Sequence, residues 1–241
     1  MITAPSPLAG SVRFVRYGFM PNRLRYCGGD NNRTLFEYGT AGASDGGLTP
    51  LLRRFTGALP YLQLIAHANG LADPFDARVV EAYWLGNELL DQIEVRQLYD
   101  SLLDRFGKQL QGRTRELVLG KAPAGARPHH SFHVLDVHSH VGELEHSLQT
   151  LDSCRVSWGQ VASVETAELV IDRPPLVLDS GKLRLAPPTR TRVLRGFADA
   201  VKPRDWVSMH WGWACEVLTA RQRTNLERYT RHHLALANQT L

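Results

Sequence analysis

The stretch Cys154-Arg-Val-Ser-Trp-Gly159-Gln160-Val161 opens the region of the chain that decides the fold. After it, β-branched and aromatic residues recur in short runs with alternating polar positions, a pattern typical of strands buried on one side. We expect strands over 156–164, 168–172, 191–196 and 206–217, and a hairpin of 176–178 with 182–185 around the turn Asp179-Ser180-Gly181. Short strands at this spacing favour a small OB-like β-barrel.

The end of the chain shows a different, helical pattern. Thr219 is a good N-cap residue, and Leu226, Tyr229 and Leu234 recur at helical spacing after it. We therefore expect a closing helix over 219–236 that follows the barrel.

Helical periodicity also dominates the chain before the β region. Residues 50–69 suit a helix that Pro60 divides, and Asp73-Pro74 is a favourable helix start before the apolar positions of 79–90. A further helix is expected over 94–110, so residues 34–120 should be mainly helical. The predicted class is α+β, with a mainly helical domain at 1–151 and a barrel domain with a terminal helix at 152–241.

Composition excludes several classes of protein. The 241 residues are 43% hydrophobic and 22% charged, which is typical of a globular chain. There is no run of about 18 apolar residues, as a membrane helix would require, and the first 20 residues lack the pattern of a secretory signal. We therefore expect a cytoplasmic protein without a membrane partner. The net charge of +4 comes from dispersed arginines, which does not favour nucleic-acid binding.

Five of the ten histidines fall within residues 129–140. β-Branching and alternation predict a strand over 129–141, on which His138 and His140 would share one side and His129 and His133 the other. Neutral imidazole is the commonest metal ligand in proteins, so His130, His133, His138 and His140 are candidate ligands. If a metal binds here, we expect His133 and one of His138 or His140 to hold it. The alternative is a set of hydrogen-bonded structural histidines.

Cys27 is a second candidate, because it is followed directly by Gly28 and Gly29. Glycines beside a cysteine leave its thiol accessible, which suits a metal ligand or a nucleophile, whereas the alternative is a half-buried turn residue. The three cysteines of the chain form no CxxC pair, and no disulfide framework follows from them. The sequence also contains no fingerprint of a nucleotide-binding loop.

Two segments, 154–161 and 205–214, together resemble the HypC/HupF family of hydrogenase-maturation chaperones. That family begins with a cysteine, three or four further residues and then Gly-Lys/Gln-Val, and it later carries Gly-Asp-Tyr/Trp-Val-x-x-His-x-Gly-x-Ala before a terminal helix. The matching positions are Cys154, Gly159, Gln160, Val161, Asp205, Trp206, Val207, His210, Gly212 and Ala214.

The resemblance implies an OB-like barrel in which Cys154 and His210 hold the iron of an Fe(CN)₂CO unit. A soft thiolate and a borderline imidazole suit iron, and they suit other transition metals as well. We expect these two side chains to lie close together at one edge of the barrel, with Cys154 at the start of its first strand.

The whole chain is also similar to proteins encoded beside [NiFe]-hydrogenase genes, through Tyr26-Cys27-Gly28, 79–84 and 128–133. These resemblances imply a chaperone-like assembly factor that binds iron or the maturing hydrogenase large subunit, with that subunit or another maturation protein as its partner. Two alternatives stay open: a metal-dependent enzyme that uses Cys27 and the histidines of 129–140, and a metal-free protein-interaction module.

Overall fold

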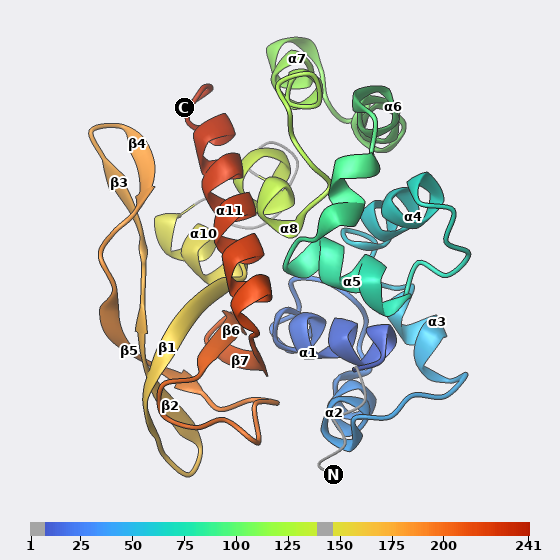
Figure 1. Cartoon of the computed structure of the whole chain (residues 1–241). Coiled ribbons are helices and arrows are strands. Elements are labelled where there is room, and N and C mark those ends of the chain that lie inside the picture. Colours follow the sequence, from blue (N-terminus) through green and yellow to red (C-terminus); the bar gives the residue numbers. More distant parts are fainter. Residues whose placement is uncertain (1–7, 139–146) are drawn as a thin grey trace.

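Helices from the first half of the chain pack against a curled sheet from the second half (Figure 1). The computed structural model describes residues 8–138 and 147–241. Its helical elements are α1 (Gly10–Arg23), α2 (Asn32–Ala41), α3 (Leu48–Leu52), α4 (Leu59–Ala68), α5 (Ala77–Trp84), η1 (Glu88–Gln92), α6 (Val95–Phe106), α7 (Gly112–Gly120), α8 (His130–Phe132), η2 (His133–Val137), α10 (Leu148–Cys154) and α11 (Ala220–Ala237). Within these described residues, no helix combines the length and the apolar content needed to cross a bilayer.

The sheet follows the strand order β1-β2-β5-β7-β6, and β6 pairs back onto β1. Its strands are β1 (Ser157–Val164), β2 (Glu168–Arg173), β5 (Thr189–Leu194), β6 (Trp206–His210) and β7 (Trp213–Val217). Neighbours are antiparallel except β5 and β7, which meet through the single parallel pair Leu194 and Trp213. The predicted hairpin forms as β3 (Leu176–Asp179) and β4 (Lys182–Leu185). The α+β class is thus confirmed, and the capping box of Thr219 starts the expected closing helix.

Several expected elements have other bounds in the structure, and for two of them the contacts give the reason. The predicted strand 206–217 is two strands, because Trp211 and Gly212 adopt left-handed φ angles of +53° and +69° and reverse the chain. The helix expected from Asp73 begins later, at Ala77, where Asp76 caps it. The Asp73 carboxylate accepts from the backbone N–H of Phe75 and stabilises a turn instead.

The predicted His-rich strand at 129–141 is wrong for residues 130–138, which are helical; residues 139–141, with His140, lie outside the described residues. The imidazole of His129 accepts from the backbone N–H of Ser131 and caps α8. The π-helical turn η2 then places Val134 and Val137 in the interior. Because this short helix is buried on several sides, its apolar residues do not show the helical period of 3.6. Their alternation with polar residues is what predicted a strand.

One apolar core crosses the predicted boundary at 151/152. It contains Phe14, Tyr83 and Trp84 from the helical half together with Trp158 and Trp213 from the sheet. Helix α1 contacts both β6 and β7. The helical half and the sheet therefore share one apolar core.

Candidate metal centre

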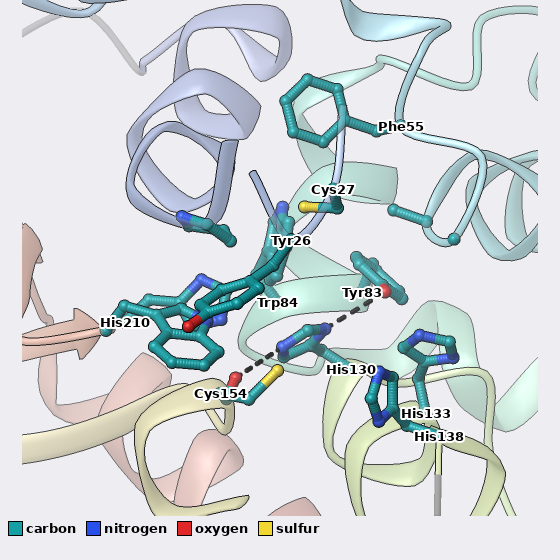
Figure 2. Close-up of a pocket in the computed structure, with 14 residues that line it drawn as sticks. Tyr26, Cys27, Phe55, Tyr83, Trp84, His130, His133, His138, Cys154 and His210 are labelled. Atoms are coloured by element: carbon teal, nitrogen blue, oxygen red, sulfur yellow. Dashed lines mark hydrogen bonds between the residues drawn. The ribbon is translucent and has the colours of Figure 1, made fainter. Parts of the chain in front are cut away.

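His130, Cys154 and His210 come from three separate elements and meet in one pocket (Figure 2). One potential ligand atom from each residue lies within 4.8 Å of the other two, and the group can hold a metal ion. The expectation that Cys154 and His210 lie close together is confirmed. His130 completes the set from the helical half of the chain, which has no counterpart in the resemblance to the chaperone family.

His210, the last residue of β6, has one ring nitrogen free of hydrogen bonds. Its Nδ1 lies 2.7 Å from the backbone oxygen of Tyr17 and must donate, because a carbonyl can only accept. Nε2 therefore carries the lone pair, and this buried atom has no hydrogen-bond partner among the described residues. Burial lowers the pKa of His210 to about 4, so the ring is neutral at pH 7. A ligating histidine typically has this arrangement, with the other nitrogen held by a carbonyl.

His130 is hydrogen-bonded at both nitrogens. Nε2 donates to the backbone oxygen of Cys154 over 2.9 Å, and Nδ1 therefore accepts from the hydroxyl of Tyr83 at 3.2 Å. Burial, and then the neighbouring His210, hold its pKa well below the usual value. Since a tyrosine hydroxyl can also accept, His130 can change tautomer and offer Nε2 to a metal while Nδ1–H turns to Tyr83.

Cys154 ends α10 and does not begin the first strand, which starts three residues later at Ser157. The backbone N–H of Trp211 donates to the oxygen of Ser153 over 2.9 Å, and this bond ties the β6–β7 turn to the end of α10. Burial raises the pKa of the Cys154 thiol to about 12, so it is protonated at neutral pH. A metal cation would replace that proton, as thiol ligands require.

The other predicted site residues have different positions around this group. Cys27, His133 and His138 line the same pocket but lie outside the three-residue group. His133 and His138, one π-helical turn apart, have ring centroids 5.9 Å apart. Ligation by His133 with His138 or His140 stays a prediction, and His140 lies outside the described residues. His129 faces elsewhere and contacts the hydroxyl of Ser131.

Aromatic side chains form much of the pocket wall around a cavity of about 70 Å³. The ring centroid of Trp84 lies 4.5 Å from that of His130 and 5.6 Å from that of His210. Tyr26 packs on Trp211 at 4.4 Å beside the pocket. The apolar wall strengthens electrostatic interactions inside it. Sequence reasoning placed residues 79–84 on an apolar helix face and did not identify Tyr83 or Trp84 as neighbours of ligands.

Comparison with known proteins identifies the family of this chain. No curated protein and no solved structure matches it significantly. The model of a family described as "Family of unknown function (DUF6390)" matches residues 6–241, which include Cys27, Cys154, His210 and every described histidine of 129–138. The chain therefore belongs to the DUF6390 family.

Proposed function

We propose that this protein binds one transition-metal ion through His130, Cys154 and His210 and serves as an assembly factor in [NiFe]-hydrogenase maturation. The observation that carries the metal site is Nε2 of His210, a buried nitrogen without a partner beside a thiol and a second imidazole. Leaving a buried polar atom unpaired costs about 1–3 kcal/mol. A metal ion at this position would remove that cost.

The donor set indicates the class of metal. One thiolate with two imidazoles suits iron(II), cobalt(II) or zinc, and does not suit calcium or magnesium, which prefer oxygen ligands. Iron is the metal that the resemblance to the chaperone family implies. The adjoining cavity of about 70 Å³ leaves room for small exogenous ligands on such an iron.

The role in assembly depends on the two segments that resemble the HypC/HupF family. One segment supplies Cys154 and the other supplies His210, so the resemblance implies two of the three residues of the close group. The partner on this proposal is the hydrogenase large subunit or another maturation protein.

Metal binding is tested on protein purified without oxygen. We expect the wild type to bind one equivalent of Fe²⁺ or Co²⁺, with a thiolate-to-metal charge-transfer band. Cys154→Ser should lose that band, and His210→Gln should weaken binding by more than the about 10–100-fold typical of outer-shell changes. His67→Gln, at an exposed histidine, is the matched control and should bind like the wild type.

The maturation role is tested separately. Infrared spectra of protein isolated from a hydrogenase-producing host should show CO and CN stretches, and Cys154→Ser should fail to support hydrogenase activity there. Full hydrogenase activity with Cys154→Ser would overturn the maturation role. A wild type that takes up no metal would overturn the metal site and favour a metal-free interaction module.

A further inference from the structure

Cys27 forms part of the wall between two cavities. It lines the buried pocket that holds Cys154 and His210, and it also lines a second cavity of about 260 Å³. The second cavity is lined by the exposed residues Arg25 and Arg54, so it faces solvent. A thiol in this position can bind a metal ion that enters from solvent before the ion reaches Cys154 and His210.

The turn that carries Cys27 is held in a defined shape. The buried amide of Asn22 donates to the backbone oxygens of Cys27 and Gly29, over 3.0 and 2.6 Å. Gly28 has a φ of +87°, and a Cβ there would lie 2.3 Å from Asn22 Nδ2 and 2.8 Å from the ring of Phe55. These contacts fix the position of the thiol relative to the pocket.

The buried pocket contains an independent sign of a ligand. Nε2 of His210 is buried and unpartnered, and His210 is only 2% exposed. Figure 2 shows Cys27 and Cys154 on different sides of this pocket. Burial raises the pKa of the Cys27 thiol to about 12, so this thiol is protonated at neutral pH. Cys27 is nonetheless absent from the close group of His130, Cys154 and His210.

We infer that Cys27 is the entry thiol of the site: it binds a soft divalent metal ion at the solvent side and passes it to Cys154 and His210. The inference rests on the proposed metal site. In the first step the metal displaces the Cys27 proton to solvent and a Cys27 S–metal bond forms. In the second step the Cys154 S–metal bond forms, the Cys27 S–metal bond breaks, and the Cys154 proton passes to Cys27. The oxidation state of the metal is unchanged.

Stopped-flow mixing of the full chain with Co²⁺ without oxygen tests the inference. We expect Cys27→Ser to reach the same final charge-transfer absorption and the same one equivalent as the wild type. Its loading rate should fall by at least about tenfold, which corresponds to about 1.4 kcal/mol in the transfer barrier. Cys215→Ala is the matched control, because the buried Cys215 thiol donates to the backbone oxygen of Trp213 and is not among the residues that line the pocket. It should load at the wild-type rate.

The outcomes separate this inference from the proposed metal site. If Cys27→Ser loads as fast as the wild type, the entry role is wrong and the site itself stands. A lower final charge-transfer intensity also overturns it, because Cys27 would then be a permanent ligand. If the wild type binds no Co²⁺, or Cys154→Ser keeps the full band, the metal site fails as well.

Folding of the variants is checked by circular dichroism, and Cys27→Ala serves as a second variant with the same expected loss of rate. If both variants are unfolded, the stopped-flow absorption of the wild type with Co²⁺ tests the entry role by itself. A transient charge-transfer band before the final one supports the entry thiol, whereas a single phase overturns it.

Discussion

Replacement of Tyr17 by phenylalanine tests a buried polar contact that joins α1 to the sheet. The hydroxyl of Tyr17 donates to the carboxylate of Glu216 over 2.8 Å, and it contacts the hydroxyl of Ser208 at the same distance. Tyr17 is 0% exposed and Glu216 is 7% exposed, so water cannot replace the lost bond. The aromatic ring, stacked on Trp84 at 5.3 Å, is retained in the variant.

The size of the effect follows from these contacts. A hydrogen bond to a charged group contributes about 1.5–3 kcal/mol. The guanidinium of Arg13, 3.2 Å from Glu216, still neutralises the carboxylate in the variant. We therefore expect Tyr17→Phe to lower the free energy of unfolding by about 2 kcal/mol, which for a chain of this length lowers Tm by about 4–8 °C.

Urea unfolding measures this change, and an m-value equal to that of the wild type shows that the change is one of stability. Tyr38→Phe is the matched control, since the half-buried Tyr38 also donates to a carboxylate, that of Asp45, but through a hydrogen bond that is exposed to solvent; the loss of that bond should cause no measurable loss of stability. Tyr17→Phe should still bind Co²⁺, because His210 is held by the backbone oxygen of Tyr17. If Tyr17→Phe lowers the free energy of unfolding by no more than Tyr38→Phe does, the buried bond between Tyr17 and Glu216 does not stabilise the contact between the two halves.

Three further changes test other contacts of the fold. Gly86→Ala should destabilise the protein by about 3 kcal/mol, because φ is +87° and a Cβ would lie 2.1 Å from the ring of Tyr229; an unchanged urea midpoint would contradict this. Lys121→Met removes the ammonium 2.9 Å from buried Asp136 and should cost about 3–5 kcal/mol by the same assay; a loss below about 1 kcal/mol would refute the importance of the pair. Burial lowers the pKa of His129 to about 3, so stability present above pH 6.5 should be lost as pH falls from 6.5 towards 3. In His129→Gln the free energy of unfolding should change less between pH 7 and 4.5 than in the wild type. The same pH profile in both proteins would contradict this.

The strands were predictable because their signals are local. The turn Asp179-Ser180-Gly181 separates two alternating runs, and the hairpin β3–β4 forms around it with Ser180 and Gly181 at positive φ. Thr219 likewise makes its cap within three residues of itself. The break between β6 and β7 was less predictable, because a left-handed tryptophan at position 211 carries no turn signal and the single Gly212 beside it can also occur inside a strand.

Which histidines would be the candidate ligands was not predictable from the sequence. On a strand, His129 and His133 would share a side, but in the helical turns of α8 and η2 His129 contacts Ser131, whereas His133 lies beside Tyr61. His129 becomes the cap, whereas His130 at the next position faces Cys154. Which imidazole reaches the thiol therefore depends on the packing of α8 against the end of α10, which no local pattern shows.

The resemblance to the chaperone family selected Cys154 and His210, but these two residues do not make the pocket alone. Helix α1 supplies the carbonyl of Tyr17 that fixes the tautomer of His210, and α5 supplies Tyr83, which allows the tautomer of His130 to change. Without these helices, His210 would lose the acceptor that keeps Nε2 available, and the thiol of Cys154 would face water. The helical half therefore completes and encloses the site, and this accounts for a core that runs across both halves.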